Sequence, residues 1–147
     1  MSLLTRKVDY AILVLSHLYE RSGGASAREI ALRFGLSRAF VANILKELCA
    51  KGYVSSHRGV KGGYEISRPV GEVTLAELID SLEHQPLRLA ACSHPAGDDS
   101  CTLAATCPVR RPIAAVHDRI HAVLRDVTLG DLFHRGEPAG ELLTLGV

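Results

Sequence analysis

A segment beginning at Ser26 constrains the fold of this chain more than any other feature of the sequence. Ser26 and Glu29 have the spacing of a capping box, in which the two side chains satisfy backbone N–H groups at the start of a helix. Residues 35–37 end that short helix, and Ser37 is a suitable N-cap for a second one. The second helix carries apolar residues on one face, namely Val41, Ile44, Leu45 and Leu48. Two helices joined by so short a turn predict a helix-turn-helix.

The helical period changes to an extended one directly after this motif. Residues 53–56 and 64–67 have the composition of strands, and they flank a glycine-rich segment at residues 59–63. This pattern is typical of a β-hairpin, and its tip lacks the residue spacing of a nucleotide-binding P-loop. An amphipathic helix that includes Val8 and Tyr19 precedes the motif. We therefore predict a mainly α fold with a small β-hairpin wing, that is, a winged helix-turn-helix.

The second half of the chain has a different organisation. A junction at residues 69–71 is followed by a second capping box, from Thr74 to Glu77, and by an irregular loop at residues 90–109. Pro112 suits the first turn of a long helix with an apolar stripe of about four turns. The stripe comprises Ile113, Val116, Ile120, Val123, Leu124 and Val127.

These patterns divide the chain into three parts. Residues 1–70 are predicted to form a winged helix-turn-helix DNA-binding domain, and residues 71–134 the cysteine loop and the long helix. Residues 128–131 begin a last short helix, and residues 135–147 are expected to form a flexible tail.

Charge is distributed unevenly along the chain. Residues 1–70 hold 11 Lys or Arg and 5 Asp or Glu, a balance of +6, whereas residues 71–147 hold 6 and 11, a balance of −5. The basic half is the candidate for contact with a polyanion such as DNA. No segment is apolar enough to span a membrane and the N-terminal segment lacks a signal core, so we expect a cytoplasmic protein with no membrane partner.

The second helix of a helix-turn-helix lies in the major groove of double-stranded DNA. Arginine and asparagine there are suited to guanine and adenine, and lysine to phosphate. The side of this helix away from the core is predicted to present Ser37, Arg38, Ala39, Ala42, Asn43 and Lys46. In the wing, Arg58 and Lys61 lie beside glycines, and an arginine there can enter a narrow minor groove. Taken singly, each residue is as consistent with an ordinary solvated position; their combination favours a DNA-binding surface.

Three of the four cysteines have the spacing C-x8-C-x5-C. Cys92, Cys101 and Cys107 lie in the irregular loop, where three thiolates can converge on one centre. Because the cytosol keeps thiols reduced, metal binding or redox sensing is favoured over disulfides. Soft thiolates select iron–sulfur clusters, zinc or copper(I), and the spacing alone does not decide between a cluster and zinc.

With these motifs together, the chain resembles a known family. Residues 4–11, the helix-turn-helix and residues 56–64 are similar to the Rrf2 family of bacterial winged-helix transcriptional regulators, which includes IscR, NsrR and RirA. The resemblance continues through the helix at Thr74, the cysteine loop and residues 126–132. The residues from Cys107 onward are most similar to the regulators of SUF iron–sulfur operons.

The resemblance implies a homodimer, joined through the long helix, that binds a pseudo-palindromic operator. It also implies an iron–sulfur cluster, of the 2Fe–2S or 4Fe–4S type, bound by the three cysteines. Arg110 stands where IscR-like members carry a histidine ligand. Asp9 matches an aspartate that NsrR-like members donate from the partner subunit, and its other interpretation is a dipole-favourable residue in the first helical turn. We therefore expect a sequence-specific regulator that senses cluster status, nitric oxide or redox stress.

The remaining candidates are weaker. His117 and His121 have i, i+4 spacing, but no third ligand is adjacent, so a solvated helix face is favoured. Cys49 lies on the core side of its helix, which favours an inert thiol, and His94 is an outside candidate for a fourth ligand. No set of nucleophile, base and orienting residue supports catalysis, so we expect no enzyme. Two alternatives stay open: the same fold using zinc or a thiol switch, and an iron–sulfur carrier without DNA function.

Overall fold

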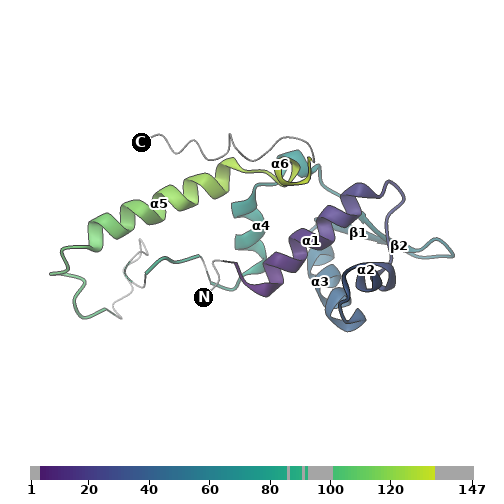
Figure 1. Ribbon diagram of the computed structural model, residues 1–147, viewed down its shortest axis with the longest axis horizontal. Helices are drawn as coiled ribbons and strands as arrows, with labels where there is room; N and C mark the ends of the chain where they lie inside the picture. The colour runs from purple at the N-terminus through teal and green to yellow at the C-terminus, as the bar shows by residue number, and fades with distance from the viewer. Residues whose placement is uncertain (1–3, 86, 91, 93–100, 135–147) are drawn as a thin grey trace.

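The computed structural model describes residues 4–85, 87–90, 92 and 101–134 (Figure 1). His94 and the tail expected at residues 135–147 lie outside the described residues. The elements in chain order are α1 (Arg6–Glu20), α2 (Ala27–Phe34), α3 (Arg38–Ala50), β1 (Val54–His57), β2 (Gly63–Ile66), the 3-10 turn η1 (Val70–Glu72), α4 (Leu75–Leu82), α5 (Arg110–Asp126) and α6 (Leu129–Phe133). The prediction of a mainly α fold with a β-hairpin wing is confirmed.

The first three helices each begin at a side-chain cap that the sequence encodes. The hydroxyl oxygens of Thr5, Ser26 and Ser37 accept hydrogen bonds from the backbone N–H three residues later, at 3.4, 3.2 and 3.2 Å. Ser26 and Glu29 form the complete capping box that their spacing predicts. Each cap satisfies a backbone donor that the helix itself leaves free, and such a cap stabilises the folded chain by about 1 kcal/mol.

The core lies among α1, α2, α3 and α4. Its fully buried side chains come from all four helices and are at most 1% exposed, for example Leu15, Ile30, Leu45 and Leu78. They recur at three- and four-residue spacings, so each helix turns one apolar face inward. Burial of such a face contributes about 1.5–3 kcal/mol per large aliphatic side chain. This packing holds the two helices of the helix-turn-helix in a fixed relation to α1.

The hairpin is anchored to the residue that precedes α2. β1 and β2 pair antiparallel, and Tyr64 of β2 also pairs with Ala25 through two backbone hydrogen bonds of 2.9 and 3.1 Å. Gly24 has a φ of +71°, and a Cβ there would lie 2.6 Å from the carbonyl oxygen of Tyr64. Only glycine satisfies both the left-handed backbone and the close approach. The wing and the start of α2 therefore form one unit.

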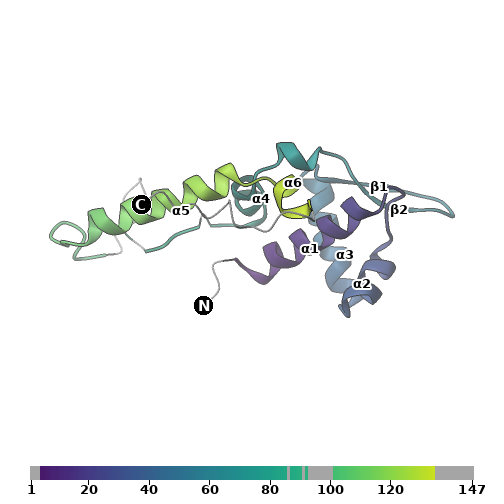
Figure 2. The same ribbon diagram turned by 45° about the horizontal axis from the view of Figure 1, so that its top comes forward.

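The long helix α5 extends away from this unit, toward the left in Figures 1 and 2. It begins at Arg110, with Pro112 in its first turn as predicted, and it packs on α4. Backbone hydrogen bonds at its C-terminal end tie it to the start of α4: Leu75 N–H donates to Val127 O at 2.8 Å, and Leu129 N–H donates to Val73 O at 2.9 Å. None of residues 110–126 is buried within the chain.

Within the part of the chain that the structure describes, no helix combines the length and the apolar character needed to cross a membrane.

Candidate nucleic-acid interface

The exposed side of α3 carries the residues predicted to read DNA. Ser37, Arg38, Ala39, Asn43 and Lys46 are exposed, and Ala42 is half-buried. The opposite side of the helix is buried, and the Phe40 ring meets the Tyr10 ring edge-on at a centroid distance of 5.2 Å. The packing on α1 therefore fixes which side of α3 faces solvent.

The wing presents its two basic residues in a short turn. Arg58 is exposed directly before a turn in which Gly62 N–H donates to Gly59 O at 2.9 Å, and Lys61 is exposed within that turn. Gly59 has a φ of +124°, which disfavours any residue with a side chain. A Cβ on Gly62 would lie 2.8 Å from the carbonyl oxygen of His57, so the turn is tight as well as basic.

A cavity of about 370 Å³ lies between the helix-turn-helix and the wing. It is lined by Ser26, Ala27, Arg28, Arg38, Ser56, His57, Arg58, Gly62, Gly63 and Tyr64. The structure thus brings together two predicted DNA-binding residues, Arg38 and Arg58, that are far apart in the sequence. It also adds Arg28, which sequence reasoning missed. The sequence signal that could have identified Arg28 is its position in the first turn of the predicted helix, next to the capping-box residue Glu29.

The charge partners of the basic residues differ across the domain. Lys7 pairs with Glu47 at 3.2 Å and Arg21 with Glu29 at 3.6 Å. Arg28, Arg38 and Arg58, by contrast, have no acidic partner within the described residues. Their positive charge is therefore available to an external anion.

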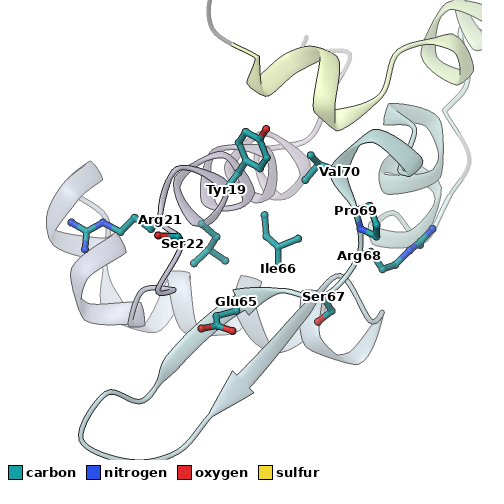
Figure 3. Close-up of a pocket in the computed structure, with 10 residues that line it drawn as sticks. Tyr19, Arg21, Ser22, Glu65, Ile66, Ser67, Arg68, Pro69 and Val70 are labelled. Atoms are coloured by element: carbon teal, nitrogen blue, oxygen red, sulfur yellow. The ribbon is translucent and has the colours of Figure 1, made fainter.

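A second cavity, of about 450 Å³, lies between the end of α1, β2 and the segment that follows the wing (Figure 3). Tyr19 of α1 and Ile66 of β2 both line it. The three charged side chains around it are each paired with another residue: Arg21 with Glu29, Glu65 with His57, and Arg68 with Glu77. These side-chain contacts leave the cavity a poor candidate for a charged ligand.

Residues 101–109, the described part of the cysteine segment next to α5, lie at the end of the molecule far from the wing (Figure 1). Cys92, Cys101 and Cys107 are free and half-buried, and tight turns connect the last two: Ala104 N–H donates to Cys101 O at 3.1 Å. Three accessible thiols are the donor chemistry that a soft metal centre requires. The described residues nevertheless contain no group of three His, Cys, Asp or Glu side chains placed to hold a metal ion. Within the described ranges, the donors are therefore present but are not assembled into a metal site.

The other ligand candidates lie apart from any such group as well. Asp9 is exposed in the first turn of α1. The rings of His117 and His121 are 4.4 Å apart between centroids, and His121 Nε2 lies 3.1 Å from the carbonyl oxygen of Leu87. Burial, and second the neighbouring His121, lower the pKa of His117. Cys49 packs against the core, and burial raises the pKa of its thiol, which fits the interpretation as an unreactive cysteine.

The apolar stripe of α5 is partly open to solvent. Val116 and Val123 are 46% and 42% exposed, whereas Ile113, Ile120, Leu124 and Val127 are half-buried. The spacing of 113, 116, 120, 123 and 127 alternates between three and four residues, which is the period of a helix that packs on a second helix. α4 packs on α5, and the backbone at Leu87 approaches α5 at His121.

Comparisons with known proteins agree with this geometry. Residues 4–135 match the Rrf2 family, described as an iron-dependent transcriptional regulator. A Rhodobacter capsulatus protein described as an rrf2-like HTH-type transcriptional regulator is 30% identical over 148 residues, which cover 96% of this chain and 99% of that protein.

Solved structures of three similar proteins span nearly the whole chain. A transcriptional regulator from Listeria innocua is 26% identical with a TM-score of 0.72, and the match covers 98% of this chain and 93% of that one. The oxidised form of CymR from Staphylococcus aureus is 23% identical with a TM-score of 0.71, covering 94% and 100%. IscR from T. potens is 21% identical with a TM-score of 0.65, covering 94% and 95%. The last two support the fold.

Proposed function

The chain belongs to the Rrf2 family of transcriptional regulators, and from this membership we propose that it is a cytoplasmic homodimer that binds an operator in double-stranded DNA and adjusts that binding through its cysteine segment. The observation that carries the DNA-binding part is the pair Arg38 and Arg58, which line one cavity without acidic partners within the described residues. Its role is regulatory, and we propose no catalytic activity.

The residues of α3 would read the major groove. Arg38 has the fork of donors that suits guanine, Asn43 the donor and acceptor that suit adenine, and Lys46 the charge that suits phosphate. The three remaining residues of this surface are small and allow a close approach: Ser37, Ala39 and Ala42. In the wing, Arg58 would enter the adjacent minor groove, where the negative potential is concentrated, and Lys61 would meet the backbone.

The homodimer would form through α5. This helix buries none of its residues in its own chain, while its apolar stripe leaves Val116 and Val123 exposed. A second copy of α5 packed on that stripe would remove this apolar surface from water. A two-fold axis there would present two reading surfaces to a pseudo-palindromic site.

An iron–sulfur cluster is the sensor that the family description and the three half-buried thiols support. Cys92, Cys101 and Cys107 would hold it, with Asp9 of the partner subunit as the fourth ligand. The bound cluster would supply sensitivity to oxidants and nitric oxide. A labile ligand set of this kind suits a sensor because the cluster is readily modified.

A second candidate is a zinc site or a thiol switch built from the same cysteines. Of these two, the thiol switch needs no assembled group of three ligands, and the described residues contain none. A structural neighbour, CymR of Staphylococcus aureus, is known in an oxidised form. An oxidant such as a peroxide can convert one thiol to a sulfenic acid, which condenses with a second thiol to a disulfide, without a preformed metal geometry.

DNA binding is tested by selecting an operator from random duplexes and titrating it. We expect Arg58→Ala to weaken binding and Asn43→Ala to lose discrimination at one base pair, by about 1–3 kcal/mol. Arg111→Ala removes an exposed charge from α5 and serves as the control. A wild-type protein that binds no duplex at low salt would contradict the proposal.

The cofactor is tested by absorbance and native mass of anaerobically prepared protein. We expect visible absorbance and a dimer that carries iron and sulfide. The absorbance, the iron and the sulfide should be lost in Cys107→Ser and retained in the control Cys49→Ser. Colourless protein with stoichiometric zinc, or with no metal and a reversible disulfide, would instead support the second candidate.

A further inference from the structure

The cavity between the helix-turn-helix and the wing has a defined place on a duplex. A recognition helix lies in the major groove and a wing in the neighbouring minor groove, and these two grooves are separated by one sugar–phosphate strand. If α3 and the wing bind as proposed, that strand has to pass across the space between them. This space is the 370 Å³ cavity that Arg28, Arg38 and Arg58 line.

Arg28 enters this cavity from a third element. It is exposed in the first turn of α2, whereas Arg38 begins α3 and Arg58 lies in the wing. The carboxylate next to it, that of Glu29, is already engaged: one oxygen accepts from Ser26 N–H at 2.7 Å, and the other lies 3.6 Å from Arg21. The guanidinium of Arg28 thus has no acidic partner within the described residues.

The backbone holds the walls of the cavity at a fixed separation. Ala25 and Tyr64 exchange two hydrogen bonds, so the start of α2 cannot move away from β2 without breaking them. A Cβ on Gly63 would lie 3.0 Å from the carbonyl oxygen of Ala25, which shows how closely the two backbones approach. A site whose walls are already in place loses little freedom when it binds an anion.

We propose that this cavity is a phosphate site, and that Arg28 binds a backbone phosphate of the strand between the two grooves. The inference rests on the proposed function and adds a contact that carries no base sequence. A guanidinium can donate two parallel hydrogen bonds to a phosphate, so Arg28 fixes the position of the duplex while α3 reads its bases. The contact is electrostatic and independent of sequence.

The test compares Arg28→Ala and Arg28→Lys with Arg33→Ala, which removes the same charge from the exposed end of the same helix, outside the cavity. Affinity is measured against salt for the selected operator and for a random duplex of equal length. One phosphate contact contributes about 0.9 to the slope of log affinity against log salt concentration. Relative to 1 M salt, this slope corresponds to about eightfold in affinity at 0.1 M salt for each subunit. Arg28→Ala should lose this on both duplexes, Arg28→Lys should keep the slope, and Arg33→Ala should resemble the wild type.

Operator duplexes that each carry one neutral methylphosphonate give a direct second measurement. At one position per half-site, neutralisation should weaken the wild-type protein and have little further effect on Arg28→Ala, because the two changes remove the same contact. The inference is overturned if Arg28→Ala binds both duplexes like the wild type, if it loses affinity for the operator alone, or if no phosphate shows this coupling. A wild-type protein that binds no duplex overturns the proposed function itself, which is a different result.

Discussion

Arg68 donates a hydrogen bond of 2.5 Å to a carboxylate oxygen of Glu77, and this ion pair joins the segment that leaves the wing to the first turn of α4. The same guanidinium lies over the ring of Tyr53, 5.5 Å from the ring centroid, and the Tyr53 hydroxyl lies 3.0 Å from the hydroxyl of Ser81 on α4. The base of the wing is therefore tied to the helix that supports α5.

Removal of the Tyr53 hydroxyl tests the strength of this connection. Tyr53 is buried, and its hydroxyl donates to Ser81 Oγ, so Tyr53→Phe should lower the free energy of unfolding by about 1 kcal/mol. Tyr19→Phe is the control, because the Tyr19 hydroxyl has no hydrogen bond within the described residues. Urea denaturation followed by circular dichroism measures both. Equal midpoints for Tyr53→Phe and the wild type would show that the hydrogen bond contributes nothing.

Two adjacent glycines provide a matched test of the contact between the wing and α2. Gly24→Ala places a Cβ 2.6 Å from Tyr64 O on a left-handed backbone, whereas a Cβ on Gly23 meets nothing within 4 Å. We expect Gly24→Ala to cost more than about 2 kcal/mol of stability. Gly23→Ala should stay within about 0.5 kcal/mol of the wild type. Similar midpoints of thermal unfolding for the two variants would contradict this account of Gly24.

The α5 stripe makes a prediction about assembly. Val116→Glu combined with Val123→Glu places charge on the exposed apolar stripe and should convert the protein to a monomer with weakened operator binding. Ala122→Glu adds the same charge at an exposed position on another side of the helix and should leave the dimer intact. Sedimentation velocity distinguishes the states. A double variant that remains dimeric places the interface elsewhere.

His17 predicts how stability depends on pH. Its side chain is buried with no partner for Nε2 within the described residues, and burial, followed by Arg21, lowers its pKa from the ordinary 6.5. Because the unfolded chain then binds the proton more tightly, the free energy of unfolding falls as the pH decreases through about 6.5. His17→Leu should reduce this loss between about pH 7.5 and pH 5.5, and also remove an unsatisfied buried nitrogen.

The control for that pH dependence is His84→Leu, since His84 is exposed. Chemical denaturation at the two pH values gives the difference directly. If His17→Leu loses as much stability as the wild type over this range, another group is responsible.

Local signals in the sequence predicted the elements well. The capping box at Ser26 and Glu29 is complete, and a second one forms at Thr128 and Asp131, where a short helix was expected. These motifs depend on neighbours three residues apart, so they can be read from the local sequence. The prediction of a capping box at Thr74 is only half right.

Tertiary contacts decided the parts that the sequence did not predict. Thr74 Oγ1 accepts from Glu77 N–H at 3.1 Å, but the Glu77 carboxylate pairs with Arg68 instead of returning to Thr74. Both strands lie one residue from their predicted limits at each end, because the pairing of Val54 with Ile66 sets their register. Arg28 enters the candidate site only because Ala25 brings α2 against the wing, a contact that no local pattern encodes.

The pairing of Ala25 with Tyr64 has a consequence for regulation. It holds the hairpin against the start of α2, so the DNA-binding domain of each subunit in a dimer would contact the duplex as one rigid body. A signal received at the cysteine segment or at α5 would then change the distance or the tilt between the two DNA-binding domains, while the structure of each domain stays the same. Operators whose half-sites are moved apart or together by one base pair would test this mechanism, since the signal would change the half-site spacing that the dimer binds most tightly.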